Sequence, residues 1–117
     1  MPTIYHITME HQWHDTQGQN QYEAEFFRSE GFIHCSDANQ VVRVANHLFR
    51  NTQGLILLHI KTELLRPRLV YENLEGGEEL FPHIYGPINL DAIVRVSSFE
   101  PGPDGTFDQY VGKFESI

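Results

Sequence analysis

The chain has 117 residues and a formal net charge of −8, with 8 basic against 16 acidic residues and a single cysteine. This length predicts one domain that buries a core, and the lone cysteine excludes an intrachain disulfide, which favours a cytoplasmic location. The acidic balance excludes nucleic acid and an anionic membrane as expected partners, and no apolar run is long enough for a membrane span. We expect a monomer whose partner is a small molecule.

The first half of the chain predicts two strands and one main helix. Hydrophobic alternation indicates a strand over residues 3–8, a short helix follows at 10–15, and a second strand covers 32–35. Apolar residues at helical spacing predict the main helix at about 38–50. Residues 22–29 are ambiguous between helix and strand.

The start of the main helix bears on function. Ser36 or Asp37 is the expected N-cap, because short polar side chains accept hydrogen bonds from the first free amides of a helix. Those amides would lie beside His34 and could receive an anion. On the helix itself, Arg43, Asn46 and Arg50 fall opposite the apolar positions, and the two arginines are expected to be solvated.

The second half of the chain predicts mainly strands. A near-continuous apolar run at 55–60 is typical of a central strand, and further strands are expected at 69–72, 83–85 and 92–99. The acidic, glycine-containing loop at 73–79 is expected to be a solvated surface. Strands outnumber helices, so we predict an α+β fold of split, mostly antiparallel sheets.

Two apolar segments, 30–37 and 81–87, carry polar side chains at alternate positions, which places those groups on one strand face. The residues concerned are His34, Ser36, His83 and Tyr85. We expect a pocket where these segments meet, with Cys35 on the opposite face as a core residue. The alternative for each histidine is a purely structural, hydrogen-bonded core residue.

Two further residues are candidates for the same pocket. His6 lies on the first strand, and Glu72 ends a later apolar strand, where a carboxylate can enter a cleft. These residues together with His34 and His83 would also offer metal ligands, but no spacing such as His-Glu-x-x-His is present, so no metal residue is assigned.

The motifs IYHI (4–7), EGFIHCS (30–36), VYE (70–72) and FPHIYGP (81–87) together resemble domain-of-unknown-function family 952. This resemblance implies an ADP-ribosyltransferase-like fold, distantly similar to the tRNA 2′-phosphotransferases, in which two small sheets hold NAD between them. The chain lacks the arginine–histidine pair of the phosphotransferases and the Gln-x-Glu signature of the transferases. tRNA is therefore not expected as a substrate.

The resemblance also implies roles for single residues. His6 would bind a ribose of NAD, and His34 and Ser36 would line the cleft. Tyr85 would stack on nicotinamide, and Glu72 would stabilise the positive charge that develops on the other ribose. We therefore expect a small NAD- or nucleotide-binding enzyme acting at a ribose anomeric carbon. Its catalytic residues would be His34, Glu72 and His83, and its cofactor-binding residues would be His6, Ser36 and Tyr85. The alternatives are a non-catalytic module for a small anionic metabolite or partner peptide, and a metal-dependent hydrolase with a histidine cluster.

Overall fold

The computed structural model describes residues 3–16, 18–25 and 27–114, and within these the chain forms three small antiparallel sheets. The first sheet has the order β1-β4-β8, with β1 (Thr3–Met9), β4 (Leu55–Lys61) and β8 (Ile93–Ser98). The second has the order β3-β6-β5, with β3 (Ile33–His34), β6 (Phe81–Tyr85) and β5 (Arg68–Glu72). The third pairs β2 (Gln21–Tyr22) with β7 (Ile88–Asn89).

Three helices and three 3₁₀ turns complete the described part of the chain. The helices are α1 (Glu10–His14), α2 (Phe27–Glu30) and α3 (Val41–Leu48), and the turns cover Thr62–Leu64, Leu90–Ala92 and Asp108–Tyr110. The predicted α+β class is confirmed. Residues 22–29 contribute to both a strand and a helix, and their Phe26 lies outside the described residues. None of the described helices is long and apolar enough to cross a membrane.

Strand β4 is apolar along most of its length because it is covered on both faces. Successive side chains of a strand point to opposite sides. Accordingly, Leu55 and Leu57 pack into one core cluster, whereas Ile56, Leu58 and Ile60 pack into the other. The expectation of a central strand at 55–60 is confirmed.

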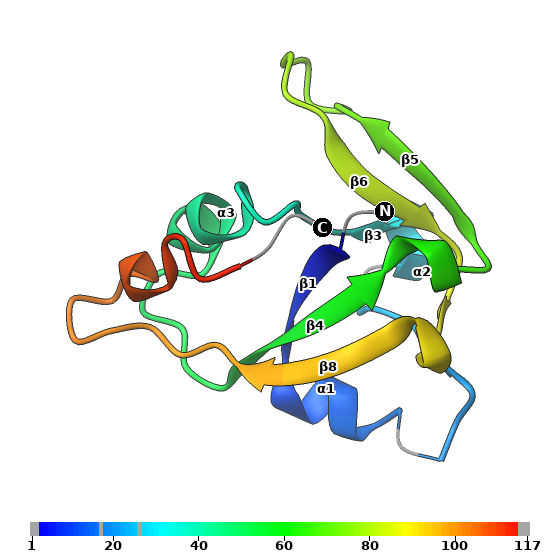
Figure 1. Cartoon of the computed structure of the whole chain (residues 1–117), viewed down its shortest axis with the longest axis horizontal. Coiled ribbons are helices and arrows are strands. Elements are labelled where there is room, and N and C mark those ends of the chain that lie inside the picture. Colours follow the sequence, from blue (N-terminus) through cyan, green and yellow to red (C-terminus); the bar gives the residue numbers. More distant parts are fainter. Residues whose placement is uncertain (1–2, 17, 26, 115–117) are drawn as a thin grey trace.

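The two clusters lie on opposite faces of the first sheet. The larger cluster joins it to the other two sheets through Ile33, Ile84, Tyr22 and Ile88. The smaller cluster fills the space beneath α3 and the C-terminal segment. In Figure 1 the second sheet lies above the first, and α3 and the C-terminal segment lie together at one side.

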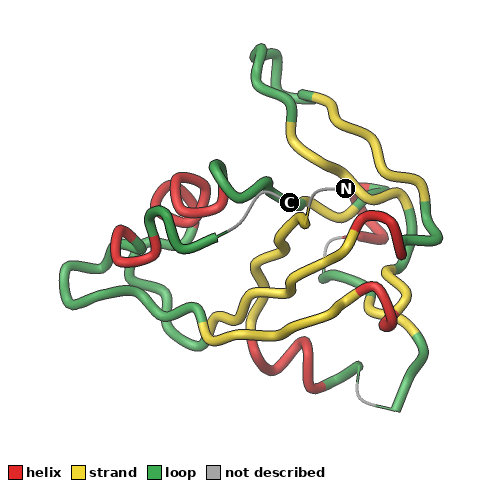
Figure 2. The backbone as a smooth tube through the Cα atoms, in the orientation of Figure 1, coloured by secondary structure: helices red, strands yellow, loops and turns green. Residues whose placement is uncertain are grey.

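A single backbone bridge connects the first sheet to the strand that carries His34. Tyr5 and Ser36 exchange two hydrogen bonds, each of 2.8 Å from amide nitrogen to carbonyl oxygen. Figure 2 shows the resulting arrangement, in which short strands of both sheets approach near the middle of the molecule.

The expected cap of the main helix is wrong. Helix α3 begins at Val41, its N-cap residue Gln40 makes no side-chain cap hydrogen bond, and the carbonyl of Asp37 instead accepts from the amides of Gln40 and Val41. The backbone of Ser36 pairs with Tyr5, and the helix begins only five residues further on. The segment after Ser36 thus turns before the helix starts, which separates the helix amides from His34 and removes the basis for an anion site there.

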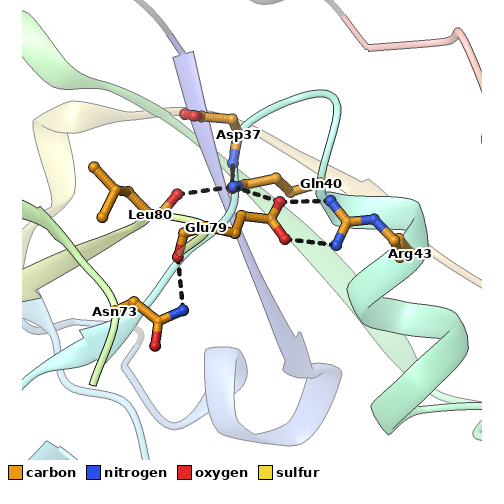
Figure 3. Close-up of polar contacts among 6 residues, drawn as sticks. All are labelled: Asp37, Gln40, Arg43, Asn73, Glu79 and Leu80. Carbon is orange, nitrogen blue, oxygen red and sulfur yellow. Dashed lines mark hydrogen bonds and ion pairs between the residues drawn. The ribbon is translucent and has the colours of Figure 1, made fainter. Parts of the chain in front are cut away.

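Arg43 and the loop after β5 are exposed, as expected, and they also bond to each other. Arg43 donates from Nη1 and Nη2 to the two carboxylate oxygens of Glu79, at 2.8 and 2.6 Å. Gln40 Nε2 donates to Glu79 at 3.1 Å and to the carbonyl of Leu80 at 2.9 Å, and Asn73 Nδ2 donates to the carbonyl of Glu79 at 2.7 Å. Figure 3 shows these contacts, which fasten the connection between β5 and β6 to α3.

Asn46, which lies on the polar side of the same helix, also has partners. Its side chain donates to Asp108 at 2.8 Å and accepts from the amide of Phe107 at 2.7 Å. The polar side of α3 therefore contacts two distant segments of the chain, and periodicity alone does not reveal this.

Candidate functional site

Strand register brings together the two segments that carry alternating polar side chains, 30–37 and 81–87. In the second sheet His34 on β3 pairs directly with His83 on β6. On the other side of β6, Val70 of β5 pairs with His83 and Glu72 with Phe81. Because alternate residues share a face, His34, His83, Tyr85 and Glu72 all lie on one face of this sheet. The opposite face carries Ile33 and Ile84, which are buried in the larger core cluster.

Aromatic contacts hold this face together. The ring centroids of His34 and His83 are 5.1 Å apart with an interplanar angle of 80°. Phe32, just before β3, stacks on His83 at 4.3 Å and contacts His34 at 4.7 Å and Tyr85 at 5.5 Å. Edge-to-face and offset geometries of this kind stabilise ring clusters beyond area burial.

Glu72 is the charged centre of the cluster. Its Oε2 accepts hydrogen bonds from the Tyr85 hydroxyl and from His83 Nδ1, the latter at 2.9 Å. These bonds, that from Tyr85 first, lower the pKa of the Glu72 carboxyl below its ordinary value, so it is ionised at neutral pH. The same carboxylate raises the pKa of Tyr85, which remains a neutral donor.

The two histidines of the cluster differ in exposure. The side chain of His83 is 5% exposed, whereas that of His34 is 53% exposed and its Nε2 lies 3.3 Å from a carboxylate oxygen of Glu30. A carboxylate only accepts hydrogen bonds, so His83 carries its proton on Nδ1 and, when neutral, keeps a lone pair on Nε2. This carboxylate–imidazole pair beside an accessible imidazole is suited to positioning a ligand and moving protons.

His6 lies behind the cluster instead of beside it. Its ring is buried, with Nδ1 2.7 Å from the carbonyl oxygen of His34 and Nε2 3.1 Å from the Tyr22 hydroxyl. Burial, only partly opposed by the bond to His34, lowers the pKa of His6 from 6.5 to about 4. A neutral His6 therefore donates from Nδ1 to the His34 carbonyl and supports the backbone of β3.

Ser36 and Cys35 are both buried, at 5% and 4% exposure. The backbone of Ser36 pairs with β1, and Cys35 belongs to the larger core cluster, as expected for its strand face. Burial raises the pKa of the Cys35 thiol, which keeps it protonated. Among the described residues no three His, Cys, Asp or Glu side chains gather in a way that would hold a metal ion.

The structure thus brings four of the six candidate residues onto one face, and it places His6 and Ser36 behind that face. Two partners were not identified from sequence. Glu30 lies beside His34, and its only signal is the i,i+4 spacing. Tyr22, the partner of His6, falls in the stretch whose pattern is ambiguous between helix and strand.

These features define a small α+β protein with an ionised carboxylate, two imidazoles and a phenol on one face of a three-stranded sheet. The family model described as "Protein of unknown function (DUF952)" matches residues 7–96. The chain belongs to this family.

Solved structures of one protein share the fold. The crystal structure of protein CC0527 from Caulobacter crescentus has a TM-score of 0.79 and 30% sequence identity, and the match covers 89% of this chain and 91% of that one. The solution NMR structure of the same protein has a TM-score of 0.81 and 29% identity, with 95% and 96% of the two chains covered. No curated protein matches the chain.

Proposed function

We propose that the chain is a small NAD- or nucleotide-handling enzyme that acts at the anomeric carbon of a ribose, with His34, Glu72, His83 and Tyr85 as its centre. The observation that carries the proposal is the ionised Glu72 carboxylate, held by two donors beside accessible rings. Resemblance to ADP-ribosyltransferase-like proteins supplies the substrate class. The arrangement of the side chains supplies the chemistry.

A fixed carboxylate favours a reaction in which positive charge develops next to it. Preorganised charge of this kind is a major source of catalytic power, because the enzyme does not have to reorient solvent during the reaction. Both donors bind Oε2 of Glu72, so Oε1 remains to contact a ligand. NAD, when bound, supplies an anomeric carbon that becomes positively charged as nicotinamide leaves.

The other residues supply positioning and proton transfer. The half-exposed ring of His34 takes a proton from an attacking hydroxyl, and His83 holds Glu72 in place. Tyr85 and Phe32 offer ring faces for a flat heterocycle such as nicotinamide. These residues fit the nicotinamide riboside half of NAD.

The adenosine half of NAD fits less directly. Both ring nitrogens of His6 have partners inside the protein, so a ribose would have to displace Tyr22 to reach them. In the proposed enzyme His6 is a positioning residue that acts through the carbonyl of His34. Arg68, whose charge contributes to the lowered pKa of Glu72, is a candidate cation for a phosphate.

Titration of isotope-labelled protein with NAD, followed by NMR, tests the proposal. We expect shifts at residues of β3, β5 and β6, and at least tenfold weaker binding in His34→Gln and Glu72→Gln. The matched control is His14→Gln, because His14 is also an exposed histidine with a glutamate four residues earlier, at 3.9 Å. It should bind NAD like the unmodified protein.

Nicotinamide release, measured by chromatography, separates catalysis from binding. The proposed enzyme releases nicotinamide, and Glu72→Gln slows the release more than it weakens NAD binding, because the lost charge acts in the transition state. Saturable binding without release would make the protein a non-catalytic binding module. Shifts confined to other surfaces, or none at all, would overturn the proposal.

A further inference from the structure

A hollow of about 510 Å³ lies against the first sheet, apart from the His34–His83 cluster on the second sheet. Strands β4 and β8 form its floor, and the C-terminal segment forms its wall. Its lining residues are His59, Arg95, Ser97, Ser98, Gln109, Tyr110, Lys113 and Phe114. Volumes of this size accommodate small-molecule ligands.

The charge of this hollow is opposite to that of the whole chain. The protein carries a net charge of −8, yet the hollow contains Arg95 and Lys113, and no carboxylate of the described residues lines it. Arg28, Arg43 and Arg66 each form an ion pair with an acidic side chain. By contrast, within the described part of the chain Arg95 and Lys113 form none, so their charges are available to a ligand.

One wall of the hollow is aromatic. The rings of Tyr110 and Phe114 are nearly parallel, with centroids 6.1 Å apart and an interplanar angle of 14°. Phe114 also contacts Tyr5, and the two ring centroids are 5.1 Å apart. This spacing leaves no room for a third ring between the two, so a flat ligand would lie against them.

Neutral polar groups also line the hollow. His59 occupies the position on β4 where Leu55 and Leu57 would predict another apolar residue, and its Nε2 lies 2.8 Å from Ser97 Oγ. Burial and the nearby Arg95 lower the pKa of His59, so its ring is neutral and available for hydrogen bonding at neutral pH. The ring of His59 also contacts Tyr5 and Phe114, with centroid distances of 5.1 and 6.3 Å, so it places a polar ring next to the aromatic wall.

We propose that this hollow binds a small organic anion with a flat apolar body. Arg95 binds the anionic group with its planar guanidinium fork, and Lys113 adds a second positive charge. Tyr110 and Phe114 pack against the apolar body. The site uses none of the residues of the proposed catalytic centre, so a negative result for one proposal does not bear on the other.

Titration with three probes, followed by NMR of the isotope-labelled full chain, tests this site. Benzoate and phenyl phosphate share a flat body and differ in the anionic group, and benzamide is the neutral counterpart of benzoate. We expect at least one of the two anions to shift amides of β8 and of residues 109–114. Benzamide should bind at least tenfold more weakly. The stronger of the two anions shows whether the site prefers a carboxylate or a phosphate.

Variants attribute the binding to the proposed residues. Arg95→Gln and Lys113→Gln should each weaken binding of the preferred anion at least fivefold, and both residues are exposed, so the fold should be unaffected. Arg50→Gln is the matched control, because it removes one exposed arginine outside the hollow. Equal binding of benzamide, unchanged binding in Arg95→Gln, or shifts only at other surfaces would overturn the proposal.

Discussion

The histidines of this chain show how surroundings decide what one side chain type does. His11, His14 and His47 are exposed, as expected for helix surfaces. His34 is accessible and lies beside a carboxylate, whereas His6 is enclosed and has a partner at each ring nitrogen. An enclosed imidazole such as that of His6 supports the fold, whereas an accessible one such as that of His34 can act on a ligand.

The burial of His6 predicts a pH dependence of stability. The unfolded chain takes up a proton at His6 below a pH of about 6.5, whereas the folded protein does so only near the lowered pKa of about 4. Between these values the unfolded state binds more protons, so the free energy of unfolding decreases as the pH falls through this window. The shift corresponds to about 3 kcal/mol across the window.

Urea unfolding at a series of pH values measures this effect. His6→Asn keeps a donor for the His34 carbonyl and has no titrating group, so its stability should decrease less between pH 6.5 and 4 than that of the unmodified protein. Carboxylates titrate alike in both proteins, and their contribution cancels in the comparison. His14→Asn, a change at an exposed histidine, should follow the unmodified protein. Parallel curves for all three proteins would show that His6 titrates normally.

At the scale of elements, the hairpin that carries Glu72, His83 and Tyr85 depends on a contact outside its own sheet. Its connection is fastened to α3 through Glu79, which binds Arg43 by two hydrogen bonds (Figure 3). This pair also lowers the pKa of Glu79. The contact therefore fixes one end of the strands on which the candidate centre is built.

Loss of this contact should loosen the hairpin connection. We expect backbone amides of residues 73–80 to exchange with solvent faster in Glu79→Gln than in the unmodified protein, with a smaller difference at high salt because the pair is exposed. Glu78→Gln removes the neighbouring charge and is the matched control. Arg43→Gln should have the same effect as Glu79→Gln, and the double variant should add little. Unchanged exchange in Glu79→Gln would show that strand pairing alone orders the connection.

The elements also show what sequence patterns can and cannot predict here. The strands at 3–8 and 55–60 follow from apolar periodicity and match β1 and β4 closely. The start of α3 does not follow, because the backbone of Ser36 is held in a bridge to Tyr5 and the chain turns at residues 38–40 before the helix begins at Val41. A local signal was present, and a tertiary contact overrode it.

The candidate centre also has one part that sequence patterns predict and one part that they do not. Alternation along each strand predicts that His83 and Tyr85 share a face. That His34 lies directly opposite His83 is a matter of register between segments 49 residues apart, which no local pattern specifies. The hollow around His59 was missed because its residues come from β4, β8 and the C-terminal segment. Its one sequence signal is the polar residue at the end of an apolar strand.

At the scale of the whole molecule, two cores share the sheet between them. Leu57 of β4 points into the smaller cluster and its neighbour Leu58 into the larger one. The only tryptophan, Trp13, packs against the larger cluster. Because residues of β4 pack into both clusters, we expect each core to lose its packing when the other does.

This arrangement predicts a single cooperative unfolding transition. Leu57→Ala should cost about 2–5 kcal/mol, as truncation of a buried leucine does, and should shift the unfolding midpoint reported by Trp13 fluorescence although the two residues belong to different clusters. The midpoint from far-ultraviolet circular dichroism should move by the same amount. Leu58→Ala, one position along the strand, is the matched change in the other cluster and should give the same coincidence of midpoints. If Trp13 fluorescence in Leu57→Ala keeps its original midpoint while circular dichroism shifts, the two cores unfold independently and β4 does not couple them.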